Sequence, residues 1–285
     1  MWRSTVIGAG SAFTAFLGLV GLLEGCAFQN GAVALSTPDD ESVSASRPQG
    51  LSSYTAEYTW QQTRHSQKML PSRGSVCFLT NVQGKFRGDS EMVKVSNVNG
   101  FWWVTGRSHQ DGVGASARCF PYDSSKVVAT QIGRSSNPGP LDLGDHAFCA
   151  LSRVSGDFGS QGDEVKVYQA STGHWFLQTS ATSSGLNGGA ICLDDVPAAP
   201  LNVGQALDVI ANQTTIIAAN LSQGQAQATE PLKGAACFLT RMTGNFSSPG
   251  QRVDTHVAGT PGGPWNFYLR AAGEPSIAAS AMCLE

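Results

Sequence analysis

One frame of residues occurs three times along the chain and restricts what it can fold into. Each copy begins at a cysteine, which a glycine, a phenylalanine and a valine follow after seven, nine and sixteen residues. A second cysteine closes each copy 42, 43 or 46 residues after the first. The frame comprises Cys77, Gly84, Phe86, Val93 and Cys119; Cys149, Gly156, Phe158, Val165 and Cys192; and Cys237, Gly244, Phe246, Val253 and Cys283. This self-similarity predicts one structural unit written three times.

The residues around the frame have the pattern of short β-strands separated by turns. Apolar and polar side chains alternate between Met92 and Val98, and Asn99-Gly100 is a hairpin signal. Phe101–Thr105 is rich in aromatic and β-branched residues, which favour strands. We therefore predict an all-β fold of three pseudo-repeated small antiparallel β modules, with four to five short strands in each.

The frame also divides the chain into ranges. We predict a signal peptide at 1–25, a flexible tether at 26–53, β repeats at 54–122 and 123–194, a linker at 195–212 and a third β repeat at 213–285. The three modules can pack around a pseudo-threefold axis, as in a β-prism or a trefoil-like arrangement, or follow one another as separate beads. Pro197, Pro200 and Gly204 before the third module favour separable units.

Cysteine usage indicates export to an oxidising compartment. The chain has seven cysteines; Cys26 lies at the signal boundary, and the other six occur two per repeat. Pairing within each repeat makes the three copies equivalent, and it predicts the disulfides Cys77–Cys119, Cys149–Cys192 and Cys237–Cys283. Each would close a loop of roughly 43 residues and stabilise the fold by about 4 kcal/mol. Six cysteines formally allow about 15 connectivities.

The first residues have the features of a secretory signal rather than a transmembrane anchor. Arg3 supplies the positive charge, and no charged residue occurs from Thr5 to Leu23. Leu23-Glu24-Gly25-Cys26 resembles the bacterial lipobox, with Glu24 as a departure from its pattern. The resemblance implies a lipoprotein-type precursor, lipidated at Cys26 and placed in the outer membrane. The alternative is cleavage by ordinary signal peptidase at Ala32-Val33-Ala34, which would give a periplasmic or secreted protein.

Composition and motifs argue against several classes of function. Only 14% of the residues are charged and the net charge is -3, which disfavours nucleic acid as a partner. The sequence has no nucleophile elbow, phosphate loop, zinc ribbon or calcium loop, and its five histidines lack metal-ligand spacing. We predict no enzyme activity, no cofactor and no metal site. The acids Asp89, Glu91, Asp163 and Glu164 precede the valine strand in two repeats only, and we interpret them as solvated turn residues.

Aromatic residues near the second hairpin strand are the candidate ligand-binding residues: Trp102, Trp175, Trp265 and Tyr268. Exposed aromatic rings can stack on the apolar faces of sugars. The alternative for Trp175 and Trp265 is a place in the core beside the disulfide, since tryptophan is highly buried on average. Trp103 and Trp175 both lie 26 residues after a first cysteine, which predicts that Trp103 is buried. Alternation then predicts that Trp102 is exposed.

These features predict an exported, lipid-anchored binding or adhesion protein of the cell surface. Its partner would be a carbohydrate or a surface protein, and it would contact the membrane through the lipid anchor only. Repetition would raise avidity without new contacts. The alternative is a structural envelope protein without a small-molecule ligand. A secreted hydrolase is disfavoured, because no converging carboxylates and no nucleophile with a base are apparent.

Overall fold

A computed structural model of the chain describes residues 57–134, 139–182, 185–195, 207–210, 214–221, 236–259 and 265–284. These residues belong to one compact unit, 46–285. They form eighteen β-strands in three antiparallel sheets of six strands each, which confirms the all-β prediction. The described residues contain no α-helix, and one short 3-10 helix, Ser124–Lys126, precedes β7.

The three sheets are named A, B and C, and their strands are given in spatial order. Sheet A consists of β1 (Tyr58–Gln61), β6 (Gly114–Pro121), β3 (Ser75–Gln83), β16 (Arg252–Gly259), β17 (Trp265–Ala272) and β14 (Thr214–Leu221). Sheet B consists of β2 (Gln67–Pro71), β5 (Phe101–Arg107), β4 (Met92–Val98), β9 (Phe148–Ser155), β12 (Asn187–Leu193) and β7 (Val127–Arg134). Sheet C consists of β13 (Leu207–Ile210), β18 (Ala278–Leu284), β15 (Ala236–Thr243), β10 (Glu164–Gln169), β11 (His174–Ser180) and β8 (Leu141–Asp145).

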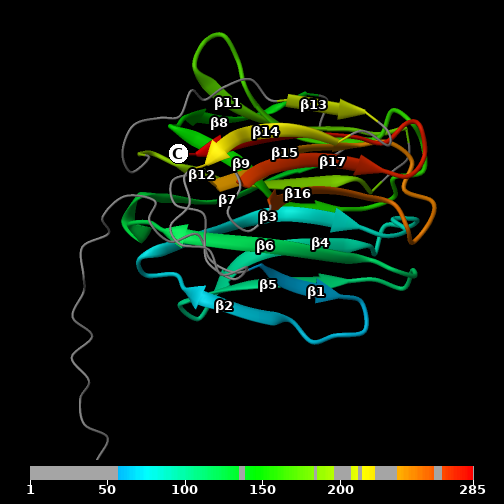
Figure 1. Cartoon of the computed structure of the whole chain (residues 1–285), viewed down its shortest axis with the longest axis horizontal. Helices are drawn as coiled ribbons and strands as arrows, with labels where there is room; N and C mark the ends of the chain where they lie inside the picture. Colours follow the sequence, from blue (N-terminus) through cyan, green and yellow to red (C-terminus); the bar gives the residue numbers. More distant parts are fainter. Residues whose placement is uncertain are drawn as a thin grey trace, which may run out of the picture. The chain divides into compact units, whose positions relative to one another are not determined.

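Every sheet combines three strands from one third of the chain with three from another. The central pairs are β3–β16 in sheet A, β9–β4 in sheet B and β15–β10 in sheet C. Figure 1 shows β3, in cyan, next to β16, in orange. The interpretation as separate beads, each with its own sheet, is therefore wrong. Residues Leu207–Ile210, inside the stretch predicted as a linker, form β13 and pair with β18.

The central pairs have the same register in all three sheets. Val82 lies opposite Val253, Val154 opposite Val93, and Met242 opposite Val165, and all six side chains are fully buried. We call residues of different sheets equivalent when they lie on corresponding strands at the same number of residues from these buried pairs. Each sheet thus has an inner face towards the core and an outer face. In β4 the inner side chains of Val93 and Val95 are buried and the outer ones of Met92, Lys94 and Ser96 are partly exposed, as alternation predicts.

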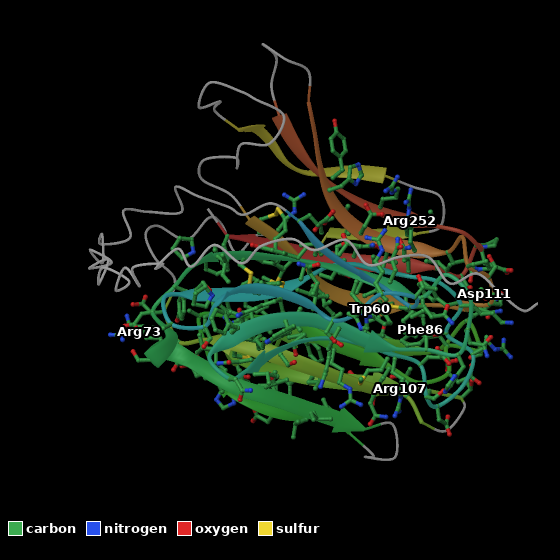
Figure 2. The ribbon with its side chains drawn as sticks, turned by 90° about the horizontal axis from the view of Figure 1, so that it is seen from below. Trp60, Arg73, Phe86, Arg107, Asp111 and Arg252 are labelled. Carbon is green, nitrogen blue, oxygen red and sulfur yellow. A yellow bond between two sulfur atoms is a disulfide. The ribbon has the colours of Figure 1, made fainter. Side chains whose placement is uncertain are left out.

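Phenylalanine rings from all three thirds of the chain meet in the core. Phe78, Phe148 and Phe238 lie with ring centroids 4.8–6.2 Å apart. A second group, Phe86, Phe158 and Phe246, has centroids 5.8–6.3 Å apart. Figure 2 shows Phe86 and Trp60 among the packed side chains, while Arg73 and Asp111 lie near opposite ends of the strands. The phenylalanine of the frame is therefore a core residue, and no third of the chain encloses its own core.

The backbones of the second phenylalanine group are joined in a ring of hydrogen bonds. The Phe86 amide donates to the Phe246 carbonyl, the Phe246 amide to Phe158, and the Phe158 amide to Phe86, each at 2.9 Å. The glycine two residues earlier brings the chain into this ring. At Gly156, φ is 109°, and a Cβ there would lie 2.4 Å from the Gly185 carbonyl oxygen. Only glycine fits such a close approach in this conformation.

The six predicted disulfide cysteines pair as their spacing suggested. Cys77 lies directly opposite Cys119, Cys149 opposite Cys192, and Cys237 opposite Cys283, and each pair is bonded. Every bridge joins neighbouring strands of one sheet. Three disulfides indicate an oxidising environment outside the cytoplasm.

Candidate functional site

Two of the predicted ligand-binding tryptophans lie in the core. The side chain of Trp102 is 3% exposed, and that of Trp175 is fully buried. Their indole nitrogens donate to backbone carbonyls, Trp102 Nε1 to Ser75 at 2.8 Å and Trp175 Nε1 to His146 at 2.7 Å. The prediction that Trp102 is the exposed ring and Trp103 the buried one is therefore wrong. Trp175 is a core residue, as the alternative interpretation of the sequence predicted.

The error arises from the length of one turn. Trp102 lies opposite Asn97 and Trp175 opposite Gln169, and these two pairs are equivalent. Four residues separate Asn97 from Trp102, whereas five separate Gln169 from Trp175. Counting residues from the first cysteine therefore aligned Trp175 with Trp103, whereas its structural equivalent is Trp102. Because side chains alternate between faces, a shift of one residue reverses inside and outside.

The other predicted site residues are Tyr268, Trp265 and Cys26. Tyr268 lies in β17, partly exposed, with its ring stacked on His256 at 5.3 Å between centroids. The backbone of Trp265 pairs with Gly259 and Leu221, and its side chain lies outside the described residues. Cys26, the predicted lipidation site, also lies outside them.

An aromatic side chain occupies the same outer-face position in every sheet. The equivalent cross-strand pairs are Ser96–Trp103 in sheet B, Tyr168–Phe176 in sheet C and His256–Tyr268 in sheet A. Tyr168 and Phe176 stack with centroids 5.7 Å apart. All six side chains are partly exposed. We name these three pairs the outer ring pairs.

The ring of Trp103 bends towards the hairpin between β4 and β5. Its Nε1 donates to the Val98 carbonyl at 3.3 Å, and the Oγ atom of the opposite Ser96 is buried without a hydrogen-bond partner. The indole therefore reaches the backbone of β4 at Val98. Beside it, Lys68 Nζ lies 3.4 Å from the centroid of the Phe101 ring, a cation–π contact.

Charged side chains adjoin the outer ring pair of sheet C. Lys166 and Arg241 lie directly opposite each other, and the carboxylate of Glu164 joins them. Its Oε1 is 2.9 Å from Lys166 Nζ, and its Oε2 is 2.6 Å from Arg241 Nε. Lys166 Nζ also lies 5.3 Å from the centroid of the Tyr168 ring. The site therefore combines an aromatic surface with cations whose charge is partly neutralised.

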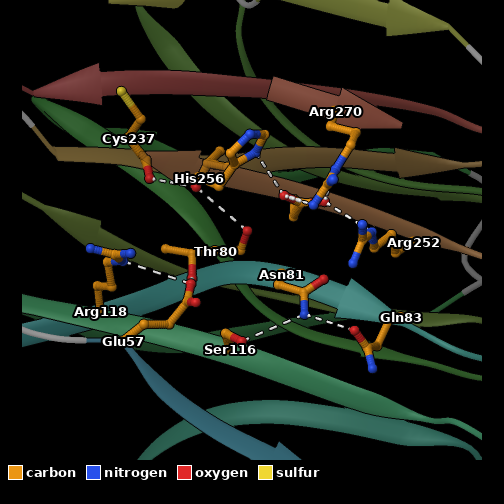
Figure 3. A network of polar contacts seen from close by, with 12 residues as sticks. Glu57, Thr80, Asn81, Gln83, Ser116, Arg118, Cys237, Arg252, His256 and Arg270 are labelled. Atoms are coloured by element: carbon orange, nitrogen blue, oxygen red, sulfur yellow. Dashed lines mark hydrogen bonds and ion pairs between the residues drawn. The ribbon is translucent and has the colours of Figure 1, made fainter. Parts of the chain in front are cut away.

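Sheet A has the opposite charge at the equivalent position. Asp254, 5% exposed, replaces the lysine. Its carboxylate lies within ion-pair distance of Arg252, His256 and Arg270, which Figure 3 labels. Arg270 donates to both carboxylate oxygens at 2.8 and 3.0 Å, and His256 Nδ1 lies 2.9 Å from Oδ2. Burial acts to raise the pKa of Asp254, but the contacts with His256 and Arg270 outweigh it and hold that pKa below its usual value.

Sheet B repeats the cation pair of sheet C without its acid. Lys94 lies opposite Arg153, and Met92 occupies the position equivalent to Glu164. Arg153 Nε donates to Ser155 Oγ at 3.3 Å. Within the described part of the chain, Lys94 takes part in no ion pair. The outer face of sheet B therefore has Lys94 and Arg153 at neighbouring positions.

Three of the four acids interpreted as solvated are buried: Glu164, described above with sheet C, and the pair Glu91 and Asp163. Glu91 is 1% exposed and Asp163 fully buried. Asp163 Oδ2 accepts from the Ser160 amide at 2.8 Å, and Glu91 Oε1 accepts from the His109 amide at 3.3 Å. Their role is to satisfy backbone groups in turns, which corrects the sequence interpretation. In the described ranges no three His, Cys, Asp or Glu side chains gather as a metal site would require.

Sequence reasoning did not single out the partly exposed rings of Tyr168, Phe176 and His256, nor the cations beside them. One available signal was the alternation from Glu164 to Tyr168, which places Glu164, Lys166 and Tyr168 on one face. The pairing of Lys166 with Arg241 had no such signal, because the two residues lie 75 positions apart in different thirds of the chain.

Comparisons with known proteins found no matching family model, no matching curated protein and no matching solved structure. In the part of the chain that the structure describes, no helix has the length and apolar character needed to span a membrane.

Proposed function

We propose that the protein is an exported, non-enzymatic binding protein of the cell surface that recognises carbohydrate through its outer ring pairs. The observation that carries the proposal is the recurrence of a partly exposed aromatic ring at the same outer-face position in all three sheets. Charged side chains adjoin the outer ring pairs of sheets C and A directly, Lys166 beside Tyr168 and Asp254 beside His256. These two pairs therefore offer both an apolar surface and polar groups. This combination suits a sugar, which has an apolar ring face and polar edges.

The proposal includes a repeated architecture. The three thirds of the chain are copies of one module, each with one disulfide, whose strands are exchanged between neighbouring sheets. The equivalent registers and the ring of hydrogen bonds among Phe86, Phe158 and Phe246 support this interpretation. Three similar sites on one rigid scaffold would bind a polymer with higher avidity than any single site.

The proposal also places the protein at the envelope. The three disulfides support export. The lipobox-like sequence ending at Cys26 supports a lipid anchor, and outer-membrane placement follows from that resemblance. Palmitate labelling of the native protein, compared with Cys26→Ser, tests the anchor; equal labelling of both would contradict it.

A glycan array tests the binding function. The full-length protein should bind a defined set of glycans, and Trp103→Ala, Phe176→Ala and Tyr268→Ala should each weaken that binding. A stacked ring contributes about 1–3 kcal/mol in comparable nucleic-acid sites, so each variant should lose roughly 5- to 150-fold in affinity for a glycan held at its own sheet. Arg73→Ala, an exposed change near one end of the strands, is the control.

Circular dichroism of each variant should match the parent, because these side chains lie on outer faces. An array without signal, together with a stoichiometric envelope partner in a pull-down, would instead favour a structural envelope protein. Hydrolysis of an array glycan by the purified protein would contradict the non-enzymatic assignment.

A further inference from the structure

The charged side chains next to the outer ring pair of sheet A converge on one buried carboxylate. Asp254 is 5% exposed, and two arginines and a histidine lie within ion-pair distance of it. Arg270 Nε and Arg252 Nε lie 2.8 and 3.6 Å from Oδ1, and His256 Nδ1 lies 2.9 Å from Oδ2. Figure 3 labels these three residues around the carboxylate.

This cluster carries an excess of positive charge. Two arginines face a single carboxylate, so one positive charge is in excess before His256 is counted. Burial acts to raise the pKa of Asp254, but its contacts with His256 and Arg270 hold that pKa below the usual value. The carboxylate is therefore ionised at neutral pH, and a negative group of a ligand would balance the remaining charge.

The two arginines have more hydrogen-bond donors than Asp254 uses. Arg270 donates to the carboxylate through Nε and Nη2. Within the described part of the chain, the Arg252 side chain makes no hydrogen bond, and Asp254 is its ion-pair partner. The Arg252 side chain is 41% exposed. Its guanidinium can therefore bind the carboxylate of a ligand through two parallel hydrogen bonds.

Sheets B and C lack the arginine that holds Asp254. The position equivalent to Arg270 is Thr105 in sheet B and Gln178 in sheet C, and neither side chain is charged. A convergent group of this kind is therefore particular to sheet A among the three equivalent positions.

His256 can add a second positive charge. Its Nδ1 atom is buried and faces the Asp254 carboxylate, which favours a proton on Nδ1 in the neutral ring. Nε2 then takes up the second proton, and within the described residues it has no hydrogen-bond partner. Histidine changes its charge between about pH 5 and 8. The positive charge of the cluster should therefore rise as the pH falls through this range.

The described neighbours of β16 in sheet A bring no further unbalanced acid to this cluster. From β3 the neighbouring side chains are the uncharged amides of Asn81 and Gln83, and from β17 they are Arg270 and Tyr268. The sequence of β14 contains no ionisable residue. Beyond β3, Glu57 lies 3.7 Å from Arg118 of β6, so its charge is balanced.

We propose that Arg252, Arg270 and His256 bind the carboxylate of an acidic sugar, of the uronic-acid type, next to the outer ring pair of sheet A. This inference rests on the proposed carbohydrate-binding function and adds its ligand class. The His256 ring joins the two parts of the site, because it contacts Asp254 and also stacks on Tyr268 with centroids 5.3 Å apart. An aromatic pair in direct contact with the charged cluster favours a sugar over an acidic peptide.

The first test compares a hexamer of galacturonic acid with its fully methyl-esterified form, which lacks the charge. Binding to the full-length protein is measured by calorimetry at pH 6. The acidic hexamer should bind about tenfold more tightly than the ester, as expected for a charge-assisted contact. Arg252→Gln should remove most of this preference. Arg73→Gln, which removes the same charge from another exposed position, should retain it.

The second test follows the same preference with pH. It should grow about fivefold from pH 8 to pH 5.5, the scale of one additional exposed ion pair. His256→Gln should keep a preference for the acidic hexamer that no longer changes with pH, a result that a merely structural role of His256 would not produce. His65→Gln, at an exposed position, should leave the pH dependence unchanged. A native preference that is the same at both pH values overturns the proposal.

The other outcomes separate this proposal from the proposed function. Equal affinity for both hexamers, or binding of neither, overturns the acidic-sugar assignment and leaves carbohydrate binding intact. A preference that Arg252→Gln leaves unchanged places the carboxylate elsewhere and overturns it too. Hexaglutamate bound as tightly as the acidic hexamer identifies the occupant as an acidic peptide and has the same consequence. Only an empty glycan array, recorded in addition, would contradict the proposed function itself.

Discussion

At the scale of single residues, Asp254 shows how burial and partners jointly set the behaviour of a charge. Its carboxylate lies among Arg252, Arg270 and His256, with Asn81 opposite on the neighbouring strand. Removing a charge from water is costly, and this cost acts to raise the pKa. Because the contacts prevail and the pKa is lowered, the ionised form is stabilised in the folded protein.

The pH dependence of stability should reveal this carboxylate. Its folded-state pKa lies below the unfolded value of about 3.9, so its contribution is fully present above that value. The contribution is lost as the pH falls through the lower, folded-state pKa. Asp254→Asn should therefore cost about 2 kcal/mol of unfolding free energy at pH 7, the scale of hydrogen bonds to a charged group.

Urea unfolding of the native protein and Asp254→Asn at pH 7 and pH 2.5 checks this expectation. The gap between the two proteins should narrow at the acidic pH. A gap that is equal at both pH values would show that ionisation of Asp254 does not contribute to stability.

At the scale of elements, the glycine seven residues after each first cysteine controls how the strand continues into its loop. Gly84, Gly156 and Gly244 all have positive φ, and each amide donates to a carbonyl of another third of the chain. The acceptors are Gln251, Glu91 and Asp163, at 2.8–2.9 Å. The glycine thus permits the approach that links neighbouring thirds.

Gly156→Ala should lower the unfolding free energy by about 3 kcal/mol, from backbone strain together with the clash against the Gly185 carbonyl. Gly162→Ala is the matched control, since Gly162 lies in the following turn and a Cβ there meets no atom within 4 Å. Chemical denaturation of both variants measures the difference. Similar losses for the two would refute a special role for Gly156.

At the scale of the whole described unit, no third of the chain has a sheet of its own. Sheet B requires strands from the first and second thirds, sheet C from the second and third, and sheet A from the third and first. The phenylalanines of the core meet across the same boundaries. Loss of one third would leave two incomplete sheets, so the unit is expected to unfold cooperatively.

Removal of one disulfide tests this cooperativity. The double variant Cys149→Ala/Cys192→Ala opens a loop of 43 residues and should lose about 4 kcal/mol. Calorimetry should show one transition, shifted as a whole to lower temperature. A separate early transition involving one third of the enthalpy, with the remainder unchanged, would instead indicate independent modules.

The spacing of cysteines and the alternation of side chains determined much of this protein without a structure. They predicted short antiparallel strands and the three disulfides, because strands depend on period two and the pairing of cysteines follows from their equivalent spacing. The sequence also indicated an oxidising compartment. The outward-facing aromatic at each second hairpin strand was partly anticipated, in Tyr268 but not in Trp103.

Only the tertiary structure decided which strands pair between thirds and which tryptophan faces the core. Sheet pairing between distant segments leaves no local periodicity, so Lys94 beside Arg153 and Lys166 beside Arg241 could not be predicted. The tryptophan error followed from a turn one residue longer in β10–β11 than in β4–β5. A strand places successive side chains on opposite faces, so one residue in a turn sufficed to exchange the buried Trp102 with the outward Trp103.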